Sequence, residues 1–499
     1  MRSNGIEHYN SKITSYALAC WILAAFGGFL FGYDIGISGG VISMDDFLIK
    51  FFPEIYERKM HVYEDNYCKY DNHKLQLFTS SLYLAALVAS FFASKASTVL
   101  GRRPTITMAS AFFSLGAILC GFANNVWMLI IGRLLFGIGV GFGNEAIPLF
   151  LIETAPIEHR GGVNILFQLF ITIGILIANI INYVMSHFHP NSWRVSLGLE
   201  ALPGAVLFVG SLIITETPAS LVQMGRDEHG KEALKRVRGV DDVEAEFREI
   251  LAAVERGRRV KRPFKRIFEK SGVPALVVSI MIQLFQQLTG INAIMFYAPV
   301  LFEMLGFRSD ASLLSSVITG LINVGSTFVS IFIVDKVGRR KLLLQACVQM
   351  FISMVAIGGI LLVYLKSTGS LHKGVDALVV VLVCTFVMSF AWSWGPMGWL
   401  IPIEIYPIET RSAGFAMAVS SNMIFTFIIA QAFLSMLCLM KAYIFFFFAA
   451  WIVVMGLFVL FLLPETKGIP MVQIEDRVWK KHPFWKRFFK DEQKADQIA

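Results

Sequence analysis

Charged residues are scarce in this chain of 499 residues: they make up 16% of the sequence, whereas about 25% is usual for a soluble protein. Apolar residues of the set AVILMFWYC make up 56%, and the mean hydropathy is +0.63. An ordinary soluble domain and a disordered chain are therefore both excluded. The formal net charge of +8 does not indicate nucleic-acid binding, because in a membrane protein the placement of basic residues matters more than their sum.

Motifs for metal, nucleotide or covalent chemistry are also missing. The cysteines show no C-x-x-C or Cys/His spacing of the kind that indicates zinc. No Walker A sequence occurs, and the glycines between Gly137 and Gly143 follow no strand, so they favour close helix packing over a nucleotide site. No nucleophile and base recur at a useful spacing. We therefore expect neither an enzyme nor a bound cofactor.

Long apolar runs take the place of the missing charges. A helix that crosses a hydrocarbon core of about 30 Å needs about 20 residues. Twelve runs are long enough, and they predict an all-α membrane protein. Their approximate bounds are 14–40, 75–99, 104–122, 126–150, 162–186, 194–214, 273–304, 312–334, 342–364, 377–402, 413–437 and 442–463.

A long polar stretch divides these spans into six and six. Basic residues collect on one side of the predicted membrane, and by the positive-inside rule that side is the cytosol. The resulting plan has a cytosolic N-terminus (1–13), a first six-helix bundle (14–214) with an outer lid loop (45–74), a cytosolic helical linker (215–272), a second bundle (273–463) and a cytosolic tail (464–499).

The two halves repeat weakly. Gly101-Arg102-Arg103 recurs 237 residues later as Gly338-Arg339-Arg340, and the pattern Glu-x-x-Pro-x-x-x-Arg occurs at Glu153 and again at Glu404. Glu216-Thr217 and Glu465-Thr466 close the sixth and twelfth spans. These three motifs recur in the same order and at nearly the same sequence offset, which indicates a duplication. Such internal duplication is a known plan of transporters.

The repeated charges predict a gate at the cytosolic span ends, where carboxylates and guanidiniums would pair and separate as the halves move. The alternative is that the basic residues only fix the topology. The predicted network consists of Arg102, Arg103, Glu153, Arg160, Glu216, Arg339, Arg340, Glu404, Arg411 and Glu465.

Asp34 and Arg133 differ because they lie inside apolar runs, where an unpaired charge costs at least about 2.5–3.5 kcal/mol. Asp34 lies about 24 Å along its span and Arg133 roughly 11 Å into its own from the other side, which places them at similar depth. An adjacent guanidinium favours the ionised carboxylate and burial favours the protonated one, so movement of Arg133 would switch Asp34. A proton-coupling device and a fixed salt bridge both remain open here.

Polar but uncharged residues form a second group within the spans. Amides offer donors and acceptors that suit vicinal hydroxyls, and an indole face can stack on a sugar. Sugar binding is one interpretation of this group, and interhelical hydrogen bonding is the other. The group comprises Gln168, the run from Gln286 to Asn292, Asn323, Asn422 and Thr426, with Trp394 and Trp399 nearby in sequence.

Taken together, these residues resemble the sugar porters of the major facilitator superfamily over essentially the whole chain. The stretches that carry the resemblance are Gly101 to Arg103, Gly132-Arg133, Glu153 to Arg160, Gln286 to Asn292, Asp335 to Arg340, Gly395 to Trp399 and Pro464 to Gly468. Within that family the chain is most similar to plant sugar transport proteins, which are proton/monosaccharide symporters. Phe31 to Gly40, Ser393 to Pro396, Cys68 and Cys438 carry the closer resemblance.

The resemblance implies two six-helix bundles and the import of a hexose such as glucose with a proton across the plasma membrane. Asp34 would accept the proton, with Arg133 as its partner. Cys68 and Cys438 would form a disulfide that ties the lid to the second half, which suits an oxidising exterior; a free Cys68 is the alternative. The implied sugar contacts are Gln168, Gln286, Gln287, Asn292, Asn323, Trp399 and Asn422, with Phe31, Ile35, Gly395 and Thr426 lining the pocket.

Three residues, Glu145, Ile403 and Gly162, depart from the family pattern, and Gly162 stands where an Ala is usual. Glu145 stands where an uncharged Gln is usual; it would either face the cavity and modify transport or pair with a base on the cytosolic side. At 3.6 residues per turn it should not share a helix face with Arg133. Ile403 replaces a polar residue. These departures keep open a sugar sensor that transports weakly. A proton-independent uniporter of the same fold is the other rival, and Asp34 argues against it.

Overall fold

The computed structural model describes residues 13–61, 68, 70–156, 159–188, 191–259, 262–295, 297, 309–368, 373–407, 409–469 and 474–489. Within these ranges the chain forms helices and no β-strand. Twelve helical segments are long and apolar enough to cross a membrane. The prediction of an all-α protein with twelve spans is therefore confirmed.

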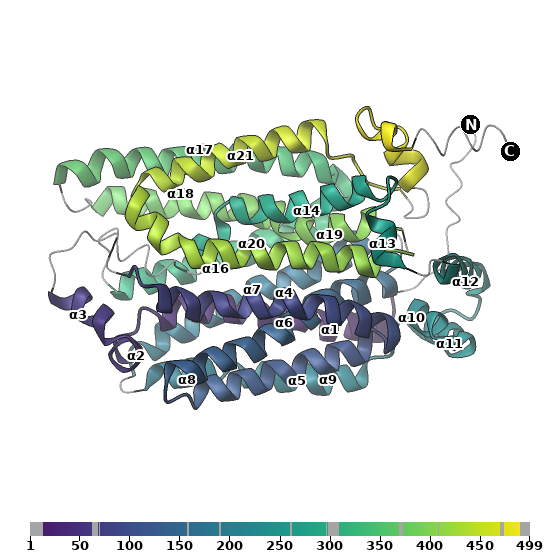
Figure 1. Cartoon of the computed structure of the whole chain (residues 1–499), viewed down its shortest axis with the longest axis horizontal. Coiled ribbons are helices and arrows are strands. Elements are labelled where there is room, and N and C mark those ends of the chain that lie inside the picture. Colours follow the sequence, from purple (N-terminus) through teal and green to yellow (C-terminus); the bar gives the residue numbers. More distant parts are fainter. Residues whose placement is uncertain are drawn as a thin grey trace.

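The spans form two bundles, drawn in purple to blue and in teal to yellow in Figure 1. The first bundle contains α1 (Ser15–Val41), α4 (His73–Val99), α5 (Arg102–Gly121), α6 (Val126–Thr154), α7 (Arg160–Met185), α8 (Ser192–Gly198) and α9 (Ala201–Ile213). The second contains α14 (Val273–Leu288), α16 (Ser309–Val337), α17 (Arg339–Thr368), α18 (Lys373–Ala391), α19 (Trp394–Ile405), α20 (Arg411–Met440) and α21 (Tyr443–Phe461).

Short helices mark the two ends of the molecule. The helices α2 (Asp45–Phe51) and α3 (Pro53–His61) lie at what we call the lid end. At the opposite end, the linker end, lie α10 (Pro218–Gln223), α11 (Asp227–Arg238), α12 (Glu244–Arg259) and α13 (Pro263–Ile267) (Figure 1). After α21 follow η4 (Glu475–Trp479) and η5 (Trp485–Phe488).

Side-chain caps begin two of the spans. Asn72 accepts a hydrogen bond from the backbone N–H of Lys74 at 2.8 Å, and Asn125 accepts one from Met128 at 2.8 Å. Such caps satisfy backbone donors that have no partner in the first turn of a helix. They place the starts of α4 and α6 where the polar connections end and the apolar runs begin.

Two spans that the sequence predicted as continuous, 194–214 and 377–402, are interrupted by proline. Pro203 and Pro396 have no backbone N–H, so they cannot bond to the fourth residue before them, and the helices break near Leu199 and Trp392. The Trp392 carbonyl instead accepts a hydrogen bond from the Ser330 hydroxyl at 3.0 Å. Each of these spans therefore consists of two shorter helices.

The predicted span 273–304 is also interrupted. Gly290 has a φ of 84°, a conformation that favours glycine, and a turn at Thr289 and Gly290 separates α14 from a helical segment that begins at Ile291. Residues 298–304 of this prediction lie outside the described residues. Interrupted spans expose backbone polar groups inside a membrane bundle, and they are where transporters commonly place binding sites.

Glycines allow α1 to pack closely on α7. Gly28, Gly32 and Gly36 follow at four-residue intervals, and a Cβ atom at Gly36 would lie only 2.8 Å from the Ile175 carbonyl oxygen. The backbones of these helices thus approach each other more closely than larger side chains would permit. In contrast, large apolar side chains such as Trp127 point outward and are exposed, as a lipid-facing surface requires.

Candidate functional site

The most deeply buried opposite charges form a pair inside the first bundle. Nη1 of Arg133 on α6 donates to Oδ1 of Asp34 on α1, and the two side chains are 2% and 0% exposed. The Arg133 guanidinium also donates to the Phe78 carbonyl oxygen at 3.1 Å and to the Ser38 hydroxyl at 3.0 Å. Oδ2 of Asp34 has no hydrogen-bond partner in the described part of the chain. The structure thus brings the two predicted residues together and gives Arg133 further acceptors.

Glu200 is a third buried charge close to this pair, and the sequence analysis missed it. It lies at the break between α8 and α9 and is 2% exposed. Its carboxylate interacts electrostatically with both Asp34 and Arg133, and its Oε1 has no hydrogen-bond partner among the described residues. The available signal was a glutamate inside the sixth apolar run, which is rare without a role.

The second bundle gathers amide side chains from α14 and α20 around the break before α19. Nδ2 of Asn422 donates to Oε1 of Gln283 and Oε1 of Gln286, at 2.7 Å in both cases. Nε2 of Gln286 donates to the carbonyl oxygens of Trp394 and Gly395 at 2.9 and 3.1 Å. Gln283 was also missed; it lies three residues before Gln286 and therefore on the same helix face.

Two residues of the first bundle, Phe167 and Gln168, lie against α19 beside this amide group. A Cβ atom at Gly395 would lie 3.2 Å from Nε2 of Gln168 on α7, and the ring of Trp399 meets that of Phe167 edge to face at 5.6 Å. Within the second bundle, the Thr426 hydroxyl donates to the Asn422 carbonyl oxygen at 2.8 Å. The predicted sugar contacts on α7, α14, α19 and α20 are thus neighbours.

The remaining predicted contacts lie apart from the amide group, and all but the partly buried Asn292 are buried. The side chain of Asn292 donates to that of Gln287, five residues earlier, across the turn after α14. Phe31 and Ile35 lie buried on α1, and Asn323 on α16 is 4% exposed. Among the described residues, no hydrogen bond or ring contact joins Phe31, Ile35 or Asn323 to the amide group.

At the linker end, the first half of the repeated motif forms a compact network. Nη2 of Arg102 lies 2.7 Å from Oε1 of Glu153, whose Oε2 accepts a hydrogen bond from the Thr217 hydroxyl at 2.6 Å. The Glu216 carboxylate accepts from the backbone N–H groups of Arg102 and Arg103 at 2.9 and 3.0 Å. Burial raises the pKa of Glu216 above its usual value, although these N–H groups and the Arg102 charge oppose the rise.

The second half repeats the same network. Nη2 of Arg339 lies 2.8 Å from Oε1 of Glu404, and Oε2 of Glu404 accepts from the Thr466 hydroxyl at 2.7 Å. The Glu465 carboxylate accepts from the backbone N–H groups of Arg339 and Arg340, both at 3.0 Å. The weak repeat in the sequence therefore corresponds to one pattern of hydrogen bonds built twice.

At this end, one arginine of each bundle interacts electrostatically with a glutamate of the other bundle. Arg411 of the second bundle is attracted by the charge of Glu153 in the first, and Arg160 of the first is attracted by Glu404 in the second. The ion pairs of the network lie within each bundle, whereas these attractions act between the bundles. The gating role of all these residues stays a prediction.

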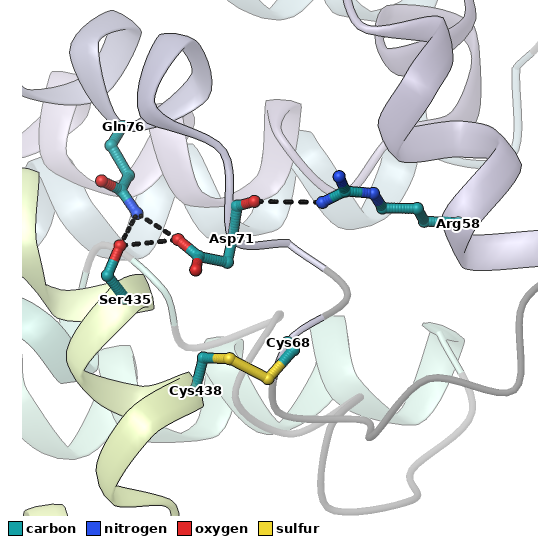
Figure 2. The surroundings of a disulfide bond; sticks show 6 residues. All are labelled: Arg58, Cys68, Asp71, Gln76, Ser435 and Cys438. Carbon is teal, nitrogen blue, oxygen red and sulfur yellow. Dashed lines mark hydrogen bonds between the residues drawn. A yellow bond between two sulfur atoms is a disulfide. The ribbon is translucent and has the colours of Figure 1, made fainter.

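At the lid end, a disulfide joins Cys68 to Cys438 of α20, as expected from the family resemblance (Figure 2). Beside it, Nε2 of Gln76 donates to Asp71 Oδ1 at 3.1 Å and to the Ser435 hydroxyl at 3.0 Å. The Ser435 hydroxyl in turn donates to Asp71 at 2.6 Å. The lid is thus tied to the second bundle by a covalent bond and by hydrogen bonds.

Glu145 and Ile403, which depart from the family pattern, are both buried. Glu145 on α6 is 0% exposed and accepts a hydrogen bond from the Ser412 hydroxyl of α20 at 3.2 Å. It forms no ion pair with any base in the part of the chain that the structure describes. Ile403 is buried on α19.

Comparisons with known proteins fit this architecture. A family model described as sugar (and other) transporter matches residues 20–478. Sugar transport protein 8 of Arabidopsis thaliana is 59% identical over 495 residues, which cover 99% of this chain and 98% of the relative. Sugar transport protein MST4 of Oryza sativa subsp. japonica is 57% identical over 492 residues, or 98% of this chain and 95% of the relative.

A solved structure with the same fold is that of the major facilitator superfamily proton:xylose symporter XylE bound to 6-bromo-6-deoxy-D-glucose. It superposes with a TM-score of 0.80 at 24% identity, over 94% of this chain and 99% of that one. At this identity the match shows the fold, with its twelve spans in two bundles.

Proposed function

Because the chain belongs to the sugar transporter family and has the fold of the major facilitator superfamily, we propose that it imports a hexose together with a proton across the plasma membrane. The protein is a multi-pass membrane transporter of sugar, not an enzyme. Its relatives in Arabidopsis and rice are named sugar transport proteins, and XylE is named a proton:xylose symporter. Coupling to a proton, the hexose and the plasma membrane are the parts that we propose.

The linker end faces the cytosol in this proposal. Both Gly-Arg-Arg motifs lie there, and basic residues are retained on the cytosolic side of a membrane. The disulfide at the lid end then faces an oxidising exterior. Sugar and protons would enter from the lid end.

The observation that carries proton coupling is the buried pair of Asp34 and Arg133, in which Oδ2 of Asp34 has no hydrogen-bond partner among the described residues. A proton on Asp34 removes its attraction for the guanidinium. Arg133 then retains the Phe78 carbonyl and the Ser38 hydroxyl as acceptors, so it is not left unpaired. Protonation from outside would thereby release α1 from α6.

The amide group supports sugar recognition. Asn422, Gln286 and Gln283 bond mainly to one another and to backbone carbonyls, and a hexose hydroxyl can replace any of these partners. Because α1 packs closely on α7, release of α1 would shift Gln168 toward or away from Gly395. Proton binding in one bundle would then favour closure over a sugar held mainly by the other.

Uptake of radiolabelled glucose by yeast that lacks hexose transporters tests the proposal. We expect faster uptake at an acidic than at an alkaline external pH, abolished by a protonophore and by Asp34→Asn. Uptake that is unaffected by external pH, by the protonophore and by Asp34→Asn would identify a uniporter and overturn proton coupling. Surface expression without uptake of any labelled hexose would overturn transport and leave a sugar sensor.

A further inference from the structure

Glu145 is a buried carboxylate that proton coupling through Asp34 does not use. It lies on α6 about two and a half turns before the end of that helix at the linker end. Its Oε1 accepts a hydrogen bond from Ser412 at 3.2 Å, and its Oε2 has no partner among the described residues. The side chain is 0% exposed.

The surroundings of Glu145 lie between the two bundles. Ser412 belongs to α20 of the second bundle, and its hydroxyl lies 3.0 Å from that of Ser94 on α4 of the first. A second pair across the same helices, Ser90 and Ser420, has hydroxyl oxygens 2.7 Å apart. The only protein group that solvates the Glu145 carboxyl among the described residues is thus supplied by the opposite bundle, and separation of α4 from α20 would remove it.

Among the described residues, no basic group forms an ion pair with Glu145. Arg102 acts on Glu145 electrostatically, but its guanidinium binds Glu153 at 2.7 Å. On α1, no residue from Ser15 to Tyr33 is charged. Arg103 of α5 donates to the carbonyl oxygens of Ser211 and Leu212. The other charged groups on helices packed against α6 towards the linker end are Lys95 of α4, which is exposed, Arg160 of α7, Glu404 of α19 and Arg411 of α20.

A carboxylate in this position would be a buried charge without an ion-pair partner, which costs several kcal/mol. A neutral carboxyl group leaves at most one hydroxyl unpaired, at about 1–3 kcal/mol. The closed interface therefore favours the protonated form. When the bundles part at the linker end, water can solvate the carboxylate and the balance reverses.

We propose that Glu145 is a second proton-binding site, which holds a proton while the bundles are closed at the linker end and releases it to water on that side when they open. The step breaks the carboxyl O–H bond and leaves a solvated carboxylate. Alkaline pH at the linker end therefore favours opening, and acidic pH favours closure. The inference rests on the two-bundle movement of the proposed function, but not on which sugar is carried.

A pair of introduced cysteines on helices other than those of Glu145 and Ser412 can report closure. A Cβ atom at Gly162 on α7 would lie 3.5 Å from Cγ2 of Ile331 on α16, so Gly162→Cys with Ile331→Cys should form a disulfide when the linker end is closed. Purified protein carrying this pair is oxidised briefly over a range of pH values. Thiol reactivity itself changes with pH, so the cross-linking rate is divided by that of the same pair in the Glu145→Gln background.

We expect this ratio to fall as the pH rises, by at most about tenfold per pH unit because one proton is released. The decline should persist when both proteins also carry Asp34→Asn, a matched loss of a buried carboxyl in the same bundle. A ratio that does not change with pH would overturn the proposal. A decline that disappears with Asp34→Asn would assign the effect to Asp34 and also overturn it.

Infrared spectroscopy tests the same proposal without a variant of Glu145. The double variant Gly162→Cys with Ile331→Cys, locked closed by full oxidation, should keep a protonated-carboxyl band at an alkaline pH where the same variant, kept reduced, loses it. Equal bands in the locked and the reduced protein would overturn the proposal, even if Glu145→Gln failed to fold.

Discussion

The two bundles bury different kinds of polar group in the middle of their spans. In the first bundle these groups include Asp34, Arg133, Glu145 and Glu200. In the second, the described buried groups away from the span ends are neutral, chiefly the amides around Asn422, and its buried charges lie at the linker end. The ends of the two bundles are alike, since each carries the same Arg–Glu–Thr network. The two halves thus share the network at their linker ends but differ in the polar residues buried in the middle of their spans.

The difference separates two tasks that place opposite demands on a membrane interior. A proton carrier needs a group whose charge changes, and such a group is expensive in lipid unless a partner lies beside it. Recognition of a neutral sugar needs donors and acceptors without charge, and amides supply both. Placing the tasks in different bundles allows the movement of one bundle against the other to couple them.

The largest effect is expected from breaking the charged pair of the first bundle. Arg133→Ala leaves Asp34 buried without its cation, close to Glu200, and should destabilise the protein by about 3–5 kcal/mol. Thermal unfolding in detergent measures the loss. Adding Asp34→Asn should recover part of it, because the uncompensated charge is then gone; a double variant no more stable than Arg133→Ala would contradict this account.

A smaller effect is expected in the second bundle. Gln286→Ala removes hydrogen bonds to Asn422 and to two carbonyls, and should raise the KM for sugar by about tenfold. The ratio of uptake at acidic to alkaline pH should not change, since no charge is altered. Gln345→Ala, which removes an exposed amide of α17, is the control. A change in the ratio of uptake at acidic to alkaline pH in Gln286→Ala would contradict the proposed division of tasks between the bundles.

The smallest difference between the two bundles is expected in their networks at the linker end. Glu153→Gln and Glu404→Gln each weaken one copy of the repeated network, and each should lower maximal uptake by about tenfold, because a hydrogen bond to a charged group contributes about 1.5–3 kcal/mol. Lys231→Ala breaks a partly exposed ion pair with Glu244 and should leave uptake unchanged. Strongly unequal effects of the two Glu variants would show that the ends have diverged as well.

Several features could be read from the sequence because their physical signal is local. The twelve spans follow from apolar length alone. The pairing of Asp34 with Arg133 followed from charge and depth, since a charge inside an apolar run requires a partner. The repeated Gly-Arg-Arg and Glu motifs likewise predicted two equivalent ends.

Other features depended on which helix faces which, and only the tertiary structure decided them. Gln283 looks like any polar residue of a span until α20 brings Asn422 to it, and the sequence marks Glu200 as a rare charge within a span but does not show that it lies beside Asp34. Helix geometry predicts that Glu145 and Arg133 lie on different faces of their helix. It could not identify Ser412 of the other bundle as the hydrogen-bond partner of Glu145. Apolar length and charge act through the solvent and can be read along the chain, whereas hydrogen-bond partners are set by packing between distant helices.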